Sequence, residues 1–162
     1  LQNFDLMVCS YKDACKFDSN SPFYQAFKNG KGFLEIPDSS DAIAAYTFGY
    51  INSSKCYKRT TDSVNLTQDV ITSGFGDWVN IFERKRSICC VLNKNLNASK
   101  SVSYIFDARK LTSDYHNIFR SDDGKRYAFV GWGNYLEELS ERGREIFLRT
   151  LRWVQCGNPE RC

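Results

Sequence analysis

The chain has 162 residues, 42% of them hydrophobic, and a formal charge of +3, which suits one domain that buries about 70% of the surface of its unfolded chain. The charge argues against nucleic-acid binding, because the one basic run, Arg84-Lys85-Arg86, is too short for an extended phosphate contact. No apolar stretch approaches the ~20 residues that cross a bilayer, so we expect no membrane span.

Cysteine is the most informative residue type in this chain. There are seven, at Cys9, Cys15, Cys56, Cys89, Cys90, Cys156 and Cys162. No Cys-x-x-Cys occurs, and the single histidine has no cysteine within twenty residues, so we expect disulfides and no metal site. Disulfides predict a secreted, extracellular protein, and the lack of a leader before Leu1 suggests the mature form.

The odd cysteine count leaves at least one thiol free or in an intermolecular bond, and a free buried thiol is the commoner outcome. The neighbours Cys89 and Cys90 cannot face the same side of a strand. We expect one of them to bond to the N-terminal arm, at Cys9 or Cys15.

The first regular element follows an irregular, disulfide-tied arm over residues 1–19. Ser21 can cap a helix that begins at Pro22, and Gly30 can supply the left-handed residue after its end. The sequence therefore predicts a short helix over Pro22–Asn29.

A period of two then runs for nearly a hundred residues, which is typical of antiparallel strands. The predicted strands are Gly32–Ile36, Ala45–Ile51, Lys55–Thr60, Asn65–Thr72, Asp77–Arg84, Ser87–Asn93, Ser101–Ala108, His116–Arg120 and Lys125–Trp132. Asp123-Gly124 favours a tight hairpin within this meander. Short strands at such regular spacing favour a closed barrel or a sandwich.

The chain ends in a predicted amphipathic helix. It starts near Asn134, and its apolar face comprises Leu136, Leu139, Ile146, Phe147, Leu151 and Val154. Gly143 lies inside it at a cost of about 1 kcal/mol relative to Ala, which indicates close packing or a break near Ser140. Gly157 and Pro159 end the helix. No linker is visible, so residues 1–162 are expected to form one domain.

Nothing in the sequence specifies a reaction. His116 is the one side chain suited to general-base work near neutral pH, and a bonded strand histidine is the simpler interpretation. Asp122-Asp123 precedes a glycine and is more simply a turn than a pair of catalytic acids. We therefore expect no enzyme activity, no catalytic residues and no cofactor.

A binding cavity is the better-supported expectation. Aromatic side chains recur at alternate strand positions, where a barrel of about eight strands can hold one small ligand. The predicted ligand-binding residues are Phe33, Tyr46, Phe48, Trp78, Phe82, Tyr104, Phe106, Tyr127 and Phe129. The alternative is that the same rings fill the interior as a packed core.

Three acceptor motifs for N-linked glycans occur, at Asn52 (Asn-Ser-Ser), Asn65 (Asn-Leu-Thr) and Asn97 (Asn-Ala-Ser). They lie in polar stretches that resemble turns. We expect a glycoprotein modified at these positions.

The stretch FYQAFKNGKGFLEI, from Phe23 to Ile36, resembles the opening of the tick salivary lipocalins, where a helix led by Trp or Phe runs into the first strand. Cys56 is similar to a strand cysteine of that family, and Phe119-Arg120-Ser121-Asp122-Asp123 is similar to its Ser-Asp-Asp turn. The terminal helix and cysteine extend the likeness over nearly the whole chain.

The resemblance implies a mainly β, lipocalin-like fold: an antiparallel up-and-down barrel with a short N-terminal and an amphipathic C-terminal helix. It further implies a bridge from Cys56 to Cys162 or Cys156. Where amine-binding members carry Cys-Asp and Glu-Leu-Trp or Glu-Leu-Tyr, this chain has Gly124-Lys125-Arg126 and Val130-Gly131-Trp132. An apolar ligand is therefore favoured over an amine, for which Glu35, Glu83 or Asp107 would have to supply the carboxylate.

The sequence thus predicts a secreted, monomeric lipocalin that sequesters a sterol, fatty acid or lipid mediator and modulates a host's immune or inflammatory defence. The alternatives are a barrel that binds a host receptor or complement factor through its loops at Asn65–Gly76 and Asn93–Lys100, a biogenic-amine scavenger, and a secreted hydrolase built on His116.

Overall fold

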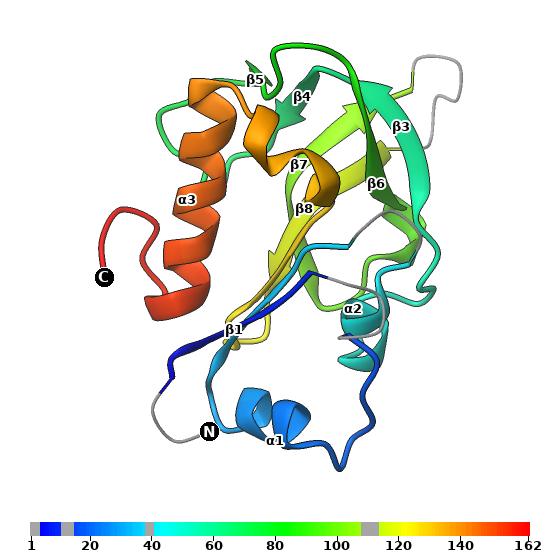
Figure 1. Cartoon of the computed structure of the whole chain (residues 1–162), viewed down its shortest axis with the longest axis vertical. Coiled ribbons are helices and arrows are strands. Elements are labelled where there is room, and N and C mark those ends of the chain that lie inside the picture. Colours follow the sequence, from blue (N-terminus) through cyan, green and yellow to red (C-terminus); the bar gives the residue numbers. More distant parts are fainter. Residues whose placement is uncertain (1–3, 11–14, 38–40, 108–113) are drawn as a thin grey trace.

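A computed structural model of the chain describes residues 4–10, 15–37, 41–107 and 114–162 (Figure 1). The strands are β1 (Leu6–Cys9), β2 (Gly32–Glu35), β3 (Tyr57–Thr61), β4 (Ser63–Leu66), β5 (Trp78–Asn80), β6 (Arg86–Leu92), β7 (Ser99–Phe106), β8 (Asp114–Ser121) and β9 (Tyr127–Val130). The helices are α1 (Pro22–Lys28), α2 (Ile43–Thr47) and α3 (Glu141–Cys156), with 3-10 helices η1 (Asn93–Asn95) and η2 (Gly133–Glu138). The predicted mainly β fold with a C-terminal helix is confirmed.

The described strands form one mixed sheet in the order β1-β2-β9-β8-β7-β4-β5, and β6 pairs with both β8 and β3. β2 runs parallel to β1 and to β9, whereas the other pairs are antiparallel. The expectation of a purely antiparallel meander is therefore wrong. The sheet is not closed in the described part of the chain, so a lipocalin barrel is not confirmed.

β6 and β9 share one edge of β8, because β9 pairs with its C-terminal half and β6 with its N-terminal half. Gly131 joins them: its N–H donates to the carbonyl of Asn117, and its own carbonyl accepts from the N–H of Cys89. A Cβ atom at Gly131 would collide with the backbone carbonyl of Cys89. Glycine is therefore required where the sheet divides into its β9 and β6 branches.

Side chains alternate between two hydrophobic cores, one on each face of the sheet. The first, which we call the α3-side core, includes Leu34, Ile36, Val64, Val79, Ile81, Phe82, Ile88, Cys90, Val102, Ile118, Val130, Trp132, Ile146 and Val154. The second, the α1-side core, includes Ala26, Phe27, Phe33, Ala44, Ala45, Tyr50, Ile51, Cys89, Val91, Phe119, Tyr127 and Phe129. In Figure 1, α3 lies beside the sheet and α1 and α2 lie near its lower end.

A local cap explains α1, and helix-forming alanines with one buried carboxylate explain α2. The hydroxyl of Ser21 accepts from the N–H of Tyr24, and Gly30 follows α1 with φ of 93°, as predicted. The predicted strand Ala45–Ile51 is wrong, because Ile43–Thr47 form α2. Its alanines favour a helix, and its first N–H groups are satisfied by the buried Glu35 carboxylate.

The C-terminal helix breaks where the sequence indicates. Residues Gly133–Glu138 form η2, and the hydroxyl of Ser140 then caps α3 by accepting from the N–H of Gly143. A side chain at Gly143 would collide with the backbone of Ile81. The close packing and the break near Ser140 are both confirmed, and Gly157 ends the helix in a left-handed conformation.

Several strands are shorter than predicted. The stretches Asn65–Thr72 and Asp77–Arg84 contribute only β4 and β5, and most of the segment between these strands consists of turns. Ala108, predicted to end the strand Ser101–Ala108, lies outside the described residues. The arm over residues 1–19, expected to be irregular, contains β1, so that expectation is wrong for Leu6–Cys9; residues 1–3 and 11–14 lie outside the described part.

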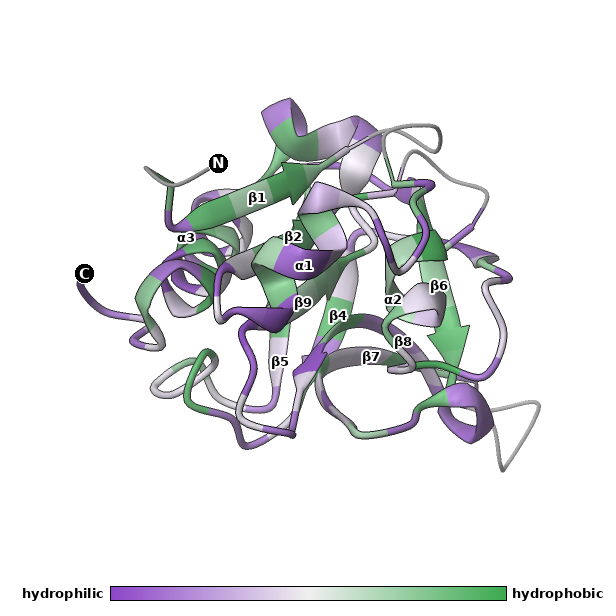
Figure 2. Cartoon of the chain, turned by 90° about the horizontal axis from the view of Figure 1, so that it is seen from below, coloured by the Kyte–Doolittle hydropathy of each residue, from purple (hydrophilic) through white to green (hydrophobic). Residues whose placement is uncertain are grey.

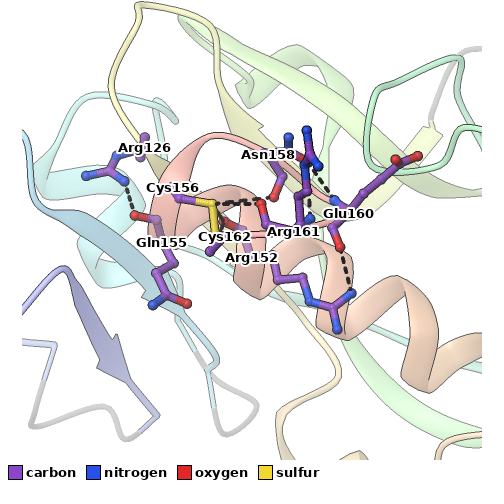
Figure 3. The surroundings of a disulfide bond; sticks show 8 residues. All are labelled: Arg126, Arg152, Gln155, Cys156, Asn158, Glu160, Arg161 and Cys162. Carbon is purple, nitrogen blue, oxygen red and sulfur yellow. Dashed lines mark hydrogen bonds between the residues drawn. A yellow bond between two sulfur atoms is a disulfide. The ribbon is translucent and has the colours of Figure 1, made fainter.

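Three disulfides join Cys9 to Cys15, Cys56 to Cys89 and Cys156 to Cys162, with Cα atoms 5.6, 5.2 and 5.7 Å apart. The bridge from Cys56 to the C-terminal cysteines is wrong, because β3 and β6 are neighbours and place Cys56 beside Cys89. The expected bond from Cys89 or Cys90 to the N-terminal arm is wrong for the same reason. Figure 3 shows the C-terminal bridge, which closes a turn just beyond α3. The expected buried free thiol is confirmed at Cys90.

Candidate functional site

An apolar groove of about 320 Å³ lies beside β1. It is lined by Phe4, Leu6, Met7, Val8, Cys9, Phe17, Phe23 and Phe33. A concave surface of this size with apolar and aromatic walls is the usual form of a small-molecule site. We therefore take it as the candidate functional site and call it the β1 groove.

Each wall of the β1 groove has a local cause. β1 pairs with β2 so that Met7 lies opposite Phe33, and Figure 2 shows β1 as a strongly hydrophobic strand. The disulfide from Cys9 to Cys15 turns the chain back after β1, and Phe17 then packs 5.6 Å from the ring of Phe33. The capped helix α1 presents Phe23, which stays 48% exposed.

One cation lies at the groove wall. The Lys31 ammonium is 5.5 Å from the centre of the Phe4 ring and 3.7 Å from a carboxylate oxygen of Asp5. Asp5 is 75% exposed, so water screens this ion pair and it contributes little to stability. Lys31 is therefore available to a negatively charged group at the same place.

Below the groove, the aromatic rings of the α1-side core pack against one another. Phe33 contacts Phe27 and Phe48 at ring distances of 6.3 and 5.0 Å, and Tyr127 stacks on Tyr50 at 4.8 Å. Such pairs contribute about 0.5–1.5 kcal/mol each beyond the area they bury. The floor of the groove consequently consists of packed apolar rings.

Glu35 lies within this core, fully buried. Its carboxylate accepts from the backbone N–H groups of Ala44 at 2.9 Å and Ala45 at 2.8 Å, and from the hydroxyl of Tyr127. Burial raises the pKa of Glu35 to about 7 although these hydrogen bonds favour the charged form. Burial also raises the pKa of Tyr127 well above its usual value, so this phenol remains a donor.

The nine predicted ligand-binding residues do not line one lumen in the structure. Phe33 lines the β1 groove, and Phe48, Tyr127 and Phe129 belong to the aromatic packing on the same side of the sheet. Phe82 is buried in the α3-side core. Tyr46, Trp78 and Phe106 are exposed, and Tyr104 is half-buried.

Most of the residues that line the β1 groove were not predicted from the sequence. Phe4, Leu6, Val8, Phe17 and Phe23 fall on the arm and the short helix, for which no site was predicted. The apolar run Leu6-Met7-Val8 beside Cys9 is the signal that could have indicated a buried strand there. Phe17 and Phe23 approach the groove only through the disulfide and the cap, which no periodicity reveals.

His116 is a buried residue of β8. Its Nδ1 atom is 2.6 Å from the hydroxyl of Ser101, and its Nε2 atom is buried without a hydrogen-bond partner. Burial lowers its pKa to about 4, so the imidazole is neutral at pH 7. The ring of Tyr104 lies 6.0 Å away.

Three of the other cavities are larger than the β1 groove, and polar or charged residues predominate in the walls of two of them. One of about 520 Å³ lies at the loop between β4 and β5, and one of about 630 Å³ lies among charged side chains such as Glu83, Arg84 and Arg144. Arg86 and Arg84 bind Glu138 there and lower the pKa of its carboxyl. Neither of these two cavities has the aromatic lining of the β1 groove, and the third, of about 480 Å³, combines Trp153 with charged residues.

Two of the carboxylates predicted for an amine ligand do not line the β1 groove. Glu35 is committed to Ala44, Ala45 and Tyr127, and Glu83 is exposed beside a different cavity. No group of three or more His, Cys, Asp or Glu residues in the described ranges could hold a metal ion. None of the helices in those ranges combines the length and apolar character that a bilayer crossing needs.

Comparison with protein-family models, with curated proteins and with solved structures finds no match for this chain. The resemblance to the tick salivary lipocalins stays a prediction. Arguments about function therefore depend on the chemistry of the described residues.

Proposed function

We propose that this protein is a secreted binder of a small hydrophobic molecule and that the ligand lies in the β1 groove. The observation that carries the proposal is the apolar lining of the groove, in which four of the eight residues are phenylalanines. Burying about 300 Å² of apolar ligand surface gains about 7 kcal/mol before ordering costs. A gain of about 7 kcal/mol corresponds to a dissociation constant of about 10 μM, so after ordering costs we expect a dissociation constant of tens to hundreds of micromolar.

Among the expected ligand classes, Lys31 favours a fatty acid over a sterol. Its ammonium lies next to Phe4 at the groove wall, where it can pair with a carboxylate whose chain lies in the groove. The exposed partner Asp5 is easily displaced. A sterol offers a hydroxyl and gains little from the same cation.

Secretion, glycosylation and descent from a lipocalin are parts of the same proposal. Three disulfides support an oxidising compartment. The helix that leads into β2 and the terminal helix α3 agree with the lipocalin resemblance. Modulation of a host's immune or inflammatory defence is supported by that resemblance alone.

Direct titration tests the proposal, with palmitate, hexadecanol and cholesterol as probes in calorimetry. We expect palmitate to bind with a dissociation constant of tens to hundreds of micromolar, and Phe23→Ala to weaken its affinity about tenfold through the loss of about 1.4 kcal/mol of contact. Tyr46→Ala is the matched control, because Tyr46 is an exposed aromatic residue on α2. Lys31→Met should weaken palmitate and leave hexadecanol unchanged.

Absence of binding by all three probes would reject the lipid proposal and move the hypothesis to recognition of a host protein. An equal loss of palmitate affinity in Phe23→Ala and Tyr46→Ala would show that the ligand binds outside the β1 groove. Equal affinity for palmitate in the wild type and in Lys31→Met would remove the fatty-acid preference and retain the groove.

A further inference from the structure

A second aromatic surface lies at the far end of the sheet from the β1 groove. Asn65 on β4 pairs directly with Trp78 on β5 and with Tyr104 on β7. Directly opposed residues of antiparallel strands point to the same face, with Cβ atoms about 4.5–5.5 Å apart. Trp78, Asn65 and Tyr104 therefore form one row across three strands.

The row points away from the α3-side core. Val64 and Leu66, on either side of Asn65, are buried in that core, as is Val79 next to Trp78. Alternation thus places Asn65 and Trp78 on the opposite face. That face is open at this end, since Trp78 is 58% exposed and Asn65 and Tyr104 are only partly buried, and α1 and α2 lie at the other end of the sheet in Figure 1.

Asn65 is the first residue of an acceptor motif for an N-linked glycan, Asn65-Leu66-Thr67. We propose that Asn65 carries a glycan and that its first sugar packs on the indole of Trp78, with Tyr104 on the other side. The apolar C–H face of a pyranose ring matches an aromatic face, and the polar amide supplies the covalent attachment. The modification covers the open end of the sheet.

The sugar donor for this attachment is a lipid-diphosphate-linked oligosaccharide. The amide nitrogen of Asn65 attacks C1 of a lipid-diphosphate-linked oligosaccharide. The N–C1 bond forms, the bond from C1 to the diphosphate oxygen breaks, and the lipid diphosphate and one amide proton leave. In the folded protein the hydroxyl of Thr67 donates to the carbonyl of Ser101 at 2.7 Å, so transfer has to precede the pairing of β4 with β7.

The other two motifs lack this setting. Trp78 is the cross-strand partner of Asn65 and not of Asn52 or Asn97. The side-chain amide of Asn97 donates to the carbonyl of Gly49 at 2.9 Å. A sugar at Asn52 or Asn97 is therefore not expected to affect Trp78.

A glycan at Asn65 would also protect an exposed edge of the sheet. β5 is a terminal strand of the sheet path, and an exposed indole on a terminal strand is a site for unwanted pairing with other chains. A bulky sugar beside it blocks edge-to-edge association. The glycan rests on the secretion in the proposed function, but it requires neither the β1 groove nor a lipid ligand.

Tryptophan fluorescence gives a direct test, because Trp132 is fully buried and Trp153 is 8% exposed, which leaves Trp78 as the accessible indole. The protein is expressed in a eukaryotic secretory host that makes high-mannose glycans, and acrylamide quenching is measured before and after two enzymes. Endoglycosidase H leaves the first sugar, and peptide N-glycosidase F removes the whole glycan. We expect quenching to stay low after the first enzyme and to rise about twofold after the second, since a stacked ring has one face covered.

Variants complete the experiment. Asn65→Gln should lose one glycan by intact mass and should show the same rise of about twofold in quenching, whereas Asn52→Gln and Asn97→Gln should leave quenching unchanged. Trp78→Phe should abolish the enzyme-dependent change. An unmodified Asn65 in the secreted wild type, or a modified Asn65 whose complete deglycosylation leaves quenching unchanged, would overturn the proposal.

Discussion

The two faces of the sheet are covered in different ways. On one face the 16-residue helix α3 packs its buried residues, among them Ile146 and Val154, onto a mainly aliphatic core. On the other face the cover consists of α1, with seven residues, and α2, with five, over a core rich in aromatic rings. Helices this short are unstable by themselves, so the α1-side face has to obtain its stability from other bonds.

Those bonds are covalent and electrostatic. The disulfides Cys9–Cys15 and Cys56–Cys89 both belong to the α1-side core, and Glu35 fixes the start of α2 through two backbone N–H groups. The α3 side has one disulfide, which joins the last residue of the helix to Cys162 and lies outside the core. Two short helices on a sheet face therefore require additional anchoring bonds, whereas one long amphipathic helix does not.

The largest effect is expected from removing the bridge of the α1-side core. Replacing Cys56 and Cys89 with Ala opens a loop whose ends are 33 residues apart, which lowers the free energy of unfolding by about 4 kcal/mol by chain entropy. Urea denaturation of the oxidised double variant measures the loss. A loss below about 1 kcal/mol would contradict the anchoring role.

The next effect concerns pH and Glu35. Its pKa is about 7 in the folded protein and 4.5 in a free chain, so the folded state binds a proton between those pH values that the unfolded state has released. The free energy of unfolding therefore falls as pH rises from 4.5 to 7, by about 3 kcal/mol. Glu35→Gln should remove this dependence.

His116 gives the opposite slope, because its pKa is lowered to about 4 and the unfolded state binds the extra proton between pH 4 and 6.5. The measurement is therefore the difference in urea midpoint between wild type and Glu35→Gln at each pH, in which the contribution of His116 cancels. A difference that stays constant from pH 4.5 to 7 would show that Glu35 has the same pKa in both states.

A smaller effect is expected from the C-terminal bridge. Cys156 and Cys162 are only six residues apart, so their replacement by Ala should lower the free energy of unfolding by about 2 kcal/mol. Both residues are exposed, and the cores stay intact. If this double variant loses more stability than the Cys56/Cys89 variant in the same urea titration, the contrast between the two faces is wrong.

The smallest effects sharpen the comparison at the helix caps. Ser21→Ala and Ser140→Ala each remove a capping hydroxyl, at a cost of about 1 kcal/mol. We expect faster amide exchange confined to α1 for Ser21→Ala, and a loss of global stability for Ser140→Ala because α3 packs on the α3-side core. Hydrogen exchange read residue by residue distinguishes the two results.

Features governed by local sequence were predictable. Ser21, Pro22 and Gly30 determine α1, Asp123-Gly124 lies in the turn between β8 and β9, and Ser140 and Gly157 bound α3. The parallel pairing of β2 with β1 and β9 was not predictable, because periodicity does not specify the partner of a strand. The β1 groove was missed for the same reason, since its walls come from three segments that meet only through strand pairing and a disulfide.

The seventh cysteine has a consequence for oxidative folding. Cys89 and Cys90 are adjacent, yet they point into opposite cores, so only Cys89 can reach Cys56 without shifting β6 by one residue. Burial raises the pKa of Cys90 to about 12, which leaves on the order of one thiolate per 100,000 molecules at pH 7. Disulfide exchange needs that thiolate. Once β6 has paired in its native register, the Cys56–Cys89 bond is therefore protected against exchange with the adjacent Cys90 thiol.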